Sequence, residues 1–330
     1  MSATTAGAAR RPRWSHLLGQ NAGLALAAGL LALSIVVYCT IYYLAQRRFP
    51  GGFELTTTLN NTMPLVLAGV AQTIVVLTRG IDLSVGGVID LTNGLAAISL
   101  GDSAAGMLAG SLLVLAVGAL CGLLNGVLIA YGRLQPIIVT LATLSIYQGI
   151  AIRVLPEPGG EVPAAYTAVL ANTRGPVSLV YLLLIVAFWA CFRRTALGVG
   201  LYAVGNDASA AQANGVAVRR TQIAAYVLSG VFAATAGLFM AATSTAGDAT
   251  TGNGYTLRSI VAVVLGGVNL FGGRGSPVGA VFGALVSAMI VNILFFSQID
   301  PLYQSFFEGL FLVIAVLLTG GIGRFMRRGA

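Results

Sequence analysis

The sequence predicts an all-α polytopic membrane protein with about ten transmembrane helices, some of them broken or re-entrant. Its 330 residues are 57% hydrophobic and only 8% charged, whereas soluble domains average about 25% charged residues. The mean hydropathy is +0.89. Apolar runs recur along the whole chain, and most approach the length of about 20 residues that spans a bilayer.

These runs divide the chain into three expected parts. A cytoplasmic N-terminal tail occupies 1–20, a transmembrane domain 21–321 and a cytoplasmic C-terminal tail 322–330. The first apolar run is too long for the core of a cleavable signal peptide. We expect spans at 22–46, 62–79, 86–101, 105–131, 136–153, 177–193, 220–243, 256–271, 277–297 and 302–321. The third and eighth runs are short, which favours broken or tilted helices there.

The arginines predict the orientation of the spans. The net charge of +8 comes from Arg alone, since the sequence contains no Lys. The arginines flank apolar runs, which is an orientation signal, so nucleic acid is not an expected partner. More of them face the cytoplasm if the N-terminus is inside, and an even number of spans then places the C-terminus inside as well. Arg47 and Arg48 oppose this topology, although Glu54 is near them in the sequence.

Residues 79–88 read Arg-Gly-Ile-Asp-Leu-Ser-Val-Gly-Gly-Val and join two apolar runs. Glycines give the backbone freedom to break a helix here. A broken helix in a membrane is buried in protein or lines a cavity, and an ionisable group there faces protein or water. We expect a helix break that shapes a transport path, with Asp82 accepting N–H bonds at the start of the next helix. The candidate residues of this region are Gln72, Gly80, Asp82, Ser84, Gly86, Asp90 and Asn93.

The longest segment expected on the cytoplasmic side is 194–219. Asn206 or Asp207 can cap a short helix, the sequence from Ala208 to Ala213 favours helix, and the following Asn-Gly pair suits a helix end. Such a helix has small side chains that would fit a groove on another protein. A plain amphipathic connector is the alternative.

Glycines at four-residue spacing predict close helix contacts, because small residues let helix backbones approach in lipid. Two such ridges are Gly118, Gly122 and Gly126, and Gly275, Gly279, Gly283 and Ser287. Two segments of the chain also show weak sequence similarity. Val75–Leu83 resembles Val263–Leu270, and both segments end an apolar run. Either an internal repeat or chance similarity between Gly/Val-rich runs explains it.

Several kinds of chemistry are excluded by residue types that the chain lacks. A Walker A loop requires a Lys, so any ATP hydrolysis belongs to a separate polypeptide. His16, the single His, lies in the N-terminal tail, which excludes a Ser–His pair or a zinc motif within the spans. We therefore expect no catalytic residue, metal or cofactor. Asp82 and Asp90 leave open an ion-coupled secondary transporter, because intramembrane carboxylates carry protons in pumps.

Three segments resemble the ribose-type permease subunits of bacterial ABC importers, a family that also includes branched-chain amino acid permeases. They are Gly80–Gly86, the stretch from Asn125 to Gly149, and Gly205–Gly215 together with Leu265–Gly279. The resemblance implies a subunit of the bacterial inner membrane, in contact with lipid, that forms the path for a ribose-like monosaccharide. It also implies separate ATPase subunits, an extracytoplasmic solute-binding protein and a second permease copy, most simply in a homodimer.

The resemblance further identifies 194–219 as the coupling segment that docks on the ATPase, with the paired alanines at the interface. The family usually has Glu just before these alanines and Arg just after, where this chain has Ser209 and Gln212. We therefore expect no salt bridge to the ATPase there. The candidate coupling residues are Asn206, Asp207, Ser209, Ala210, Ala211, Gln212 and Gly215.

Overall fold

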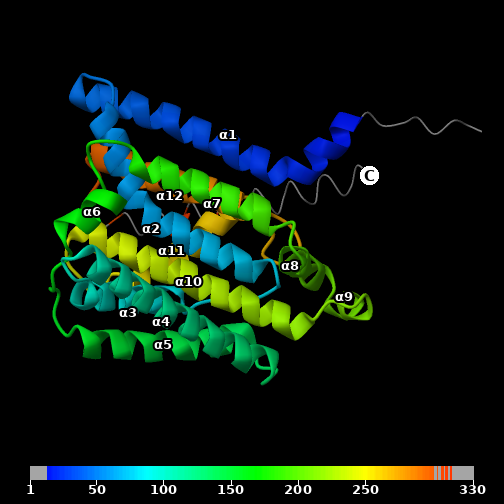
Figure 1. Cartoon of the computed structure of the whole chain (residues 1–330). Coiled ribbons are helices and arrows are strands. Elements are labelled where there is room, and N and C mark those ends of the chain that lie inside the picture. The colour runs from blue at the N-terminus through cyan, green and yellow to red at the C-terminus, as the bar shows by residue number, and fades with distance from the viewer. Residues whose placement is uncertain (1–12, 301–302, 304–305, 308, 311–312, 314–330) are drawn as a thin grey trace, which may run out of the picture.

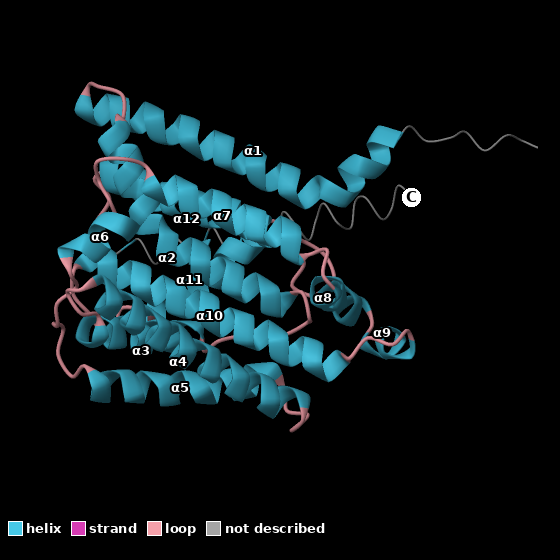
Figure 2. Cartoon of the chain, in the orientation of Figure 1, coloured by secondary structure: helices cyan, strands magenta, loops and turns pink. Residues whose placement is uncertain are grey.

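A computed structural model describes residues 13–300 and residues 303, 306, 307, 309, 310 and 313. The described residues form helices and loops and contain no β-strand (Figure 2), which confirms the predicted all-α class. The helices are α1 (Arg13–Gln46), α2 (Gly52–Val76), α3 (Val85–Ser99), α4 (Ala104–Ala130), α5 (Pro136–Val154), α6 (Ala164–Leu170), α7 (Val177–Phe192), α8 (Ala196–Asn206), α9 (Ala208–Ala213), α10 (Val218–Ser244), α11 (Asn253–Leu265) and α12 (Pro277–Phe296).

The long helices lie roughly parallel, with α6 at one end of the bundle and α8 and α9 at the other (Figure 1). Helix α10 is central and packs against α2, α3 and α4, while α1 packs mainly along α12. Large apolar side chains are exposed along α4, α5 and α7, among them Leu112, Ile138 and Leu183. Exposed apolar faces of this extent suit lipid, so the chain is a multi-pass membrane protein.

The described residues do not show ten full-length spans. Six helices are long and apolar enough to cross a membrane: α1 from Gly23, α2, α4, α5, α10 and α12. A seventh span requires joining α7 to α8, which are bent by 79°. Helices α3 and α11 would extend only about 22 Å and about 20 Å, less than a hydrocarbon core of about 30 Å. Residues 1–12, most of the expected tenth span 302–321 and the tail 322–330 lie outside the described residues.

Several predicted boundaries differ from the structure. Helix α2 begins ten residues before the expected span, because nearly three turns rich in Thr and Asn precede its apolar part. Helix α11 ends at Leu265 rather than residue 271, since Gly267 adopts the left-handed conformation (φ 68°) that terminates a helix. Helices α6 and α8 were not anticipated, because both lie in segments without a long apolar run.

The two glycine ridges form close helix contacts, as predicted. A Cβ on Gly118 or Gly122 would overlap atoms of α10, including the Tyr226 carbonyl, so α4 and α10 touch through their backbones. Gly279 and Gly283 meet the end of α11 in the same way. In lipid such packing supplies the contact energy that the hydrophobic effect supplies in water.

The two similar segments, Val75–Leu83 and Val263–Leu270, share a local backbone geometry. Helices α2 and α11 both close with a bond that spans five residues, Gly80 N–H to Val75 O at 3.2 Å and Val268 N–H to Val263 O at 3.1 Å. The residue before each donor is left-handed, with φ 66° at Arg79 and 68° at Gly267. The same bond and left-handed residue also close α9 (Val216 N–H to Ala211 O at 3.0 Å) and α12 (Ile299 N–H to Leu294 O at 3.1 Å), so this geometry does not distinguish a repeat from chance similarity.

Candidate functional site

Asp82 lies in the segment between α2 and α3 and is only 3% exposed. One carboxylate oxygen accepts the backbone N–H of Ser84 at 3.0 Å and its hydroxyl at 2.6 Å. The other oxygen accepts the hydroxyl of Ser229 on α10 at 2.9 Å. The carboxylate thus serves the N-terminus of α3, where the helix dipole favours negative charge. The N–H group that it accepts belongs to Ser84, the N-cap of α3.

Two side chains from neighbouring helices hold the broken segment in place. The amide of Gln72 on α2, oriented so that both its ends are satisfied, donates to the Asp82 carbonyl at 2.8 Å and accepts its N–H at 3.2 Å. Asn125 on α4 donates to the Ser84 hydroxyl at 2.8 Å. The chain therefore folds back against α2 after the helix ends. The Asn125 amide oxygen itself is buried without a hydrogen-bond partner among the described residues, so only its N–H side contributes to holding the segment.

Asp90 performs the corresponding task for α11. It is fully buried on α3, and one of its oxygens accepts the N–H of Gly252, the N-cap of α11, at 2.5 Å. One turn further along α3, the amide of Asn93 accepts the N–H of Asp248 at 3.3 Å. The loop 245–252 is therefore held against α3 by two side chains. A carboxylate at the start of α11 is again placed where the helix dipole favours it.

The N-termini of the two short helices lie side by side. Gly86 N–H donates to the Thr256 hydroxyl at 3.2 Å, and this hydroxyl donates to the Leu83 carbonyl at 3.3 Å. A Cβ on Gly86 would overlap Thr256, so only Gly permits this approach. Two short helices that begin at one point, each with a buried carboxylate, form the arrangement of discontinuous helices found at transporter binding sites.

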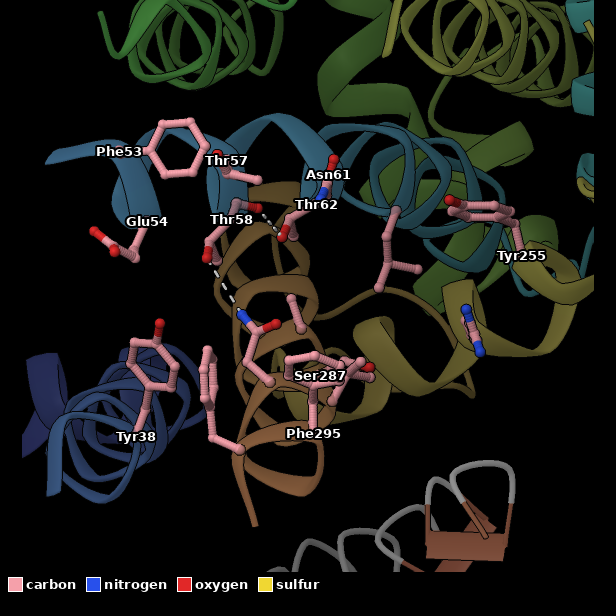
Figure 3. A pocket seen from close by; sticks show the side chains of 16 residues that line it. Tyr38, Phe53, Glu54, Thr57, Thr58, Asn61, Thr62, Tyr255, Ser287 and Phe295 are labelled. Atoms are coloured by element: carbon pink, nitrogen blue, oxygen red, sulfur yellow. Dashed lines mark hydrogen bonds between the residues drawn. The ribbon is translucent and has the colours of Figure 1, made fainter. Parts of the chain in front are cut away.

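A pocket of about 390 Å³ lies between α1, α2, α11 and α12. Figure 3 shows Glu54, Thr57, Thr58 and Asn61 of α2 on one side of it and Ser287 of α12 on another. Asn292 donates to the Thr58 hydroxyl across the pocket at 3.3 Å. The lining also includes Tyr38, Tyr255 and Arg258. The pocket is polar enough to bind a small hydroxylated molecule by hydrogen bonds.

None of the seven residues predicted for the path lines this pocket. Gln72, Asp82, Ser84, Asp90 and Asn93 are instead buried around the two helix starts, and Gly80 and Gly86 pack beside them. One residue in the sequence does indicate the pocket. Arg258 is an ionisable residue within an expected span, and such residues usually face a cavity or a protein partner.

Segment 194–219 contains the predicted short helix, α9, which runs from Ala208 to Ala213. Asp207 caps it by accepting the N–H groups of Ser209 at 2.8 Å and Ala210 at 2.9 Å. These bonds, and then the charge of Arg79, hold the pKa of Asp207 below its usual value. Gly215 follows with φ 85°, as expected for the residue that ends a helix.

The paired alanines of α9 point in different directions. Ala211 is buried against the chain itself, so its side chain is not available to a partner protein. Ser209, Ala210 and Gln212 are exposed. The alternation has a simple cause, because α9 is one and a half turns long and must pack one side on its own chain. The exposed side is therefore narrower than the sequence suggested.

Together these features define a class: a multi-pass helical membrane protein with discontinuous helices, a polar pocket and a short exposed helix, α9. A family model described as the branched-chain amino acid transport system / permease component matches residues 55–316, and the chain belongs to this family. The predicted resemblance is thereby confirmed.

Individual relatives are import permeases. The autoinducer 2 import system permease protein LsrC of Yersinia pestis (strain Pestoides F) is 30% identical over 302 residues, covering 88% of this chain and 84% of the relative. The fructose import permease protein FrcC of Rhizobium meliloti is 35% identical over 313 residues, covering 88% of this chain and 83% of the relative. No solved structure matches the chain.

Proposed function

We propose that the chain is the permease subunit of an ATP-binding cassette importer and forms the membrane path for a ribose-like monosaccharide. The membership of the permease family is the observation that carries this proposal. The exposed helix α9 supplies a docking element for a separate ATPase, which the absence of Lys requires. A fructose import permease among the relatives supports a sugar as the substrate.

In this proposal the sugar enters through the pocket between α1, α2, α11 and α12. The threonine and amide groups there can exchange hydrogen bonds with sugar hydroxyls. An extracytoplasmic binding protein delivers the sugar and does most of the selection, so the path itself needs only weak affinity.

The competing function, an ion-coupled secondary transporter using Asp82 and Asp90, is less well supported. Each carboxylate accepts a backbone N–H at or beside the start of a short helix. These bonds give each carboxylate a structural role at a helix start. Proton carriers also need a route to water, and Asp82 and Asp90 are 3% and 0% exposed.

The assembly follows from the same reasoning. We propose that α3 and α11 cross the bilayer together with the irregular segments 77–84 and 245–252, and that a last span within 302–321 completes ten crossings. Both termini and α9 then face the cytoplasm, in the inner membrane of a bacterium. Two copies of the chain, one per ATPase, complete the path.

Uptake by proteoliposomes tests this proposal against its rival. The chain is reconstituted with the ATPase and the binding protein that co-purify with it, and uptake of radiolabelled ribose and fructose is measured with ATP enclosed. Uptake should require ATP and the binding protein and should persist when an uncoupler removes the proton gradient. Uptake that needs no ATP and stops with the uncoupler would establish the secondary transporter instead.

A second experiment tests the docking role of α9. Ala210→Glu places a charge on the exposed side of α9 and should reduce binding-protein-stimulated ATP hydrolysis at least tenfold while the chain still inserts. Ala168→Glu is the matched control, because it makes the same change on the exposed short helix α6 at the opposite end of the bundle (Figure 1). Full stimulation in Ala210→Glu would exclude α9 as the docking element.

A further inference from the structure

Three segments that are distant in the sequence meet at the docking end of the bundle. They are the end of α2, the end of α8 and the glycine-rich loop 266–276. The Leu77 carbonyl at the end of α2 accepts the N–H of Gly273 in this loop at 3.1 Å. Gly205 on α8 packs so closely on the same carbonyl that a Cβ would overlap it. The contact is therefore between backbones and leaves no flexible side chain to absorb a displacement.

The loop is also tied directly to α8. Tyr202 donates from its hydroxyl to the Gly275 carbonyl at 2.9 Å. The amide of Asn206 donates to the Gly273 carbonyl at 3.3 Å. Asn206 is the last residue of α8, and Asp207, the cap of α9, follows it immediately. Any movement of α9 therefore acts on this junction through a single peptide unit.

Arg79 adds a side-chain connection across the junction. It donates from Nε to the Gly205 carbonyl at 2.7 Å and from its terminal nitrogen to the Asn206 carbonyl. The last carbonyls of a helix lack partners within the helix, and the helix dipole favours a cation beside them. Arg79 thus caps α8, although it belongs to the segment that follows α2.

The backbone of Arg79 is unusual for a residue with a side chain. Its φ of 66° lies in the left-handed region, which glycine adopts much more readily. Such a conformation persists where the surrounding structure fixes it, and it often marks a functional position. Only Gly80 and Ile81 separate Arg79 from Asp82, which holds the start of α3.

We propose that Arg79 is a positioning residue that links the docking segment to the broken helix, so that displacement of α8 and α9 by the ATPase moves residues 80–84. This inference rests on the proposed function, because it assumes that an ATPase acts on α9. The broken helix between α2 and α3 and the docking helix are then joined by one guanidinium group and one backbone contact.

The experiment measures the number of sugar molecules imported per ATP hydrolysed by the reconstituted complex, with fructose and ribose as probes. Arg79→Ala removes both bonds to α8 and should lower this ratio at least fivefold, with assembly and basal ATP hydrolysis within twofold of wild type. Arg79→Lys should recover part of the ratio, because an ammonium group can still donate to the same carbonyls. A cap that only stabilised α8 would change assembly and leave the ratio unaltered.

Arg133→Ala is the matched control. Arg133 is also a left-handed arginine (φ 55°), follows α4 and is exposed. Among the described residues no hydrogen bond or ion pair to its side chain is found, so the ratio should stay unchanged. A wild-type ratio in Arg79→Ala would overturn the inference while leaving the proposed function intact.

Two further outcomes are informative. If Arg79→Ala does not assemble, the ratio is measured in Arg79→Gln, which keeps a neutral N–H donor on a shorter side chain. Failure of both variants to assemble, or a normal ratio in Arg79→Gln, would assign Arg79 a purely structural role and overturn the inference. Absence of ATP-dependent uptake in the wild type would instead reject the proposed function.

Discussion

Asp82 shows how a buried charge is tolerated in this protein. Its carboxylate is surrounded by donors from Ser84 and Ser229, and no Arg or Lys forms a salt bridge with it in the described structure. Burial of an unpaired carboxylate is costly unless hydrogen bonds replace the water that it loses. The backbone N–H at the start of α3 is a donor that needs such a partner. The Asp82 carboxylate and the backbone N–H at the start of α3 therefore each supply the hydrogen-bond partner that the other needs.

From this follows a prediction for two substitutions of Asp82. Asp82→Asn keeps an oxygen that can accept the Ser84 N–H, and the Ser229 hydroxyl can rotate to accept from the new amide. It should retain substantial ATP-driven uptake. Asp82→Leu leaves these buried donors without an acceptor and should lower the free energy of unfolding by about 1–3 kcal/mol and abolish uptake.

Uptake in proteoliposomes and unfolding of the purified chain in detergent measure the two effects. Asp102→Leu, at an exposed carboxylate before α4, provides the control and should behave as wild type. Equal loss of uptake in Asp82→Asn and Asp82→Leu would support the proton-carrier function instead.

At the scale of elements, the α4–α10 contact depends on residues without side chains. Gly122 lies against the Tyr226 carbonyl, and there is no room for a methyl group. Insertion of extra volume into a packed interface typically costs about 1–3 kcal/mol. Gly122→Ala should lower the unfolding free energy by about this amount, despite the higher helix propensity of Ala.

A substitution at Gly149 on α5 separates the effect of helix propensity from the effect of the steric overlap. A Cβ on Gly149 would meet nothing within 4 Å, so Gly149→Ala should stabilise the chain by about 0.5–1 kcal/mol through helix propensity alone. Unfolding of both variants under the same detergent conditions makes the comparison. Equal stability of Gly122→Ala and Gly149→Ala would show that α4 and α10 are not in backbone contact.

The cap of α9 gives a prediction at the same scale. Asp207→Ala should speed hydrogen exchange of the amides in Ser209–Gly215 several-fold, while Asp207→Asn should keep most of the protection, because Asn is also a good cap. The control is Ser103→Ala, which removes the similar cap of α4 and should leave α9 unaffected. Unchanged exchange in Asp207→Ala would show that the cap does not hold α9.

The pH dependence of this cap follows from the lowered pKa of Asp207. Hydrogen bonds to the backbone N–H groups of Ala210 and Ser209, and the charge of Arg79, favour the ionised carboxylate in the folded protein. Its stabilising effect is therefore fully present above the ordinary Asp pKa of about 4 and is lost as the pH falls through the lower folded value. Protection of α9 should not change between about pH 6 and about pH 8.

At the scale of the whole molecule, the orientation in the membrane is the main open prediction. Arg48 forms an ion pair with Glu54, which also accepts the Tyr42 hydroxyl at 2.8 Å. The positive-inside rule counts Arg and Lys and gives nearby carboxylates little weight, so Arg47 and Arg48 still oppose a cytoplasmic N-terminus and the other arginines carry this prediction.

Cysteine labelling in whole cells tests this topology. Cys39, Cys121 and Cys191 are free in the structure and are first replaced by Ala. A cysteine introduced at Ser209 should not react with an impermeant maleimide, whereas one at the exposed Ala168 should react. The reverse pattern would invert the proposed orientation and place α9 on the outside, where no ATPase could bind it.

The sequence alone determined the class of this protein, its helix break and the short capped helix α9. These features depend on local chemistry: apolar run length, Gly-Ile-Asp-Leu-Ser between two runs, and an Asp-capped alanine helix that ends at Asn-Gly. The close packing of α4 on α10 was also predictable, because glycines at four-residue spacing form one helix face.

Only the tertiary structure decided which groups these residues meet. Asp90 was a candidate path residue, yet it caps α11 because the loop 245–252 folds back onto α3. Arg79 was read as an orientation signal, yet it reaches carbonyls more than 120 residues away. Ala211 was expected at a partner interface and instead packs inward. Sequence periodicity describes one helix at a time, whereas each of these contacts depends on how separate helices pack together.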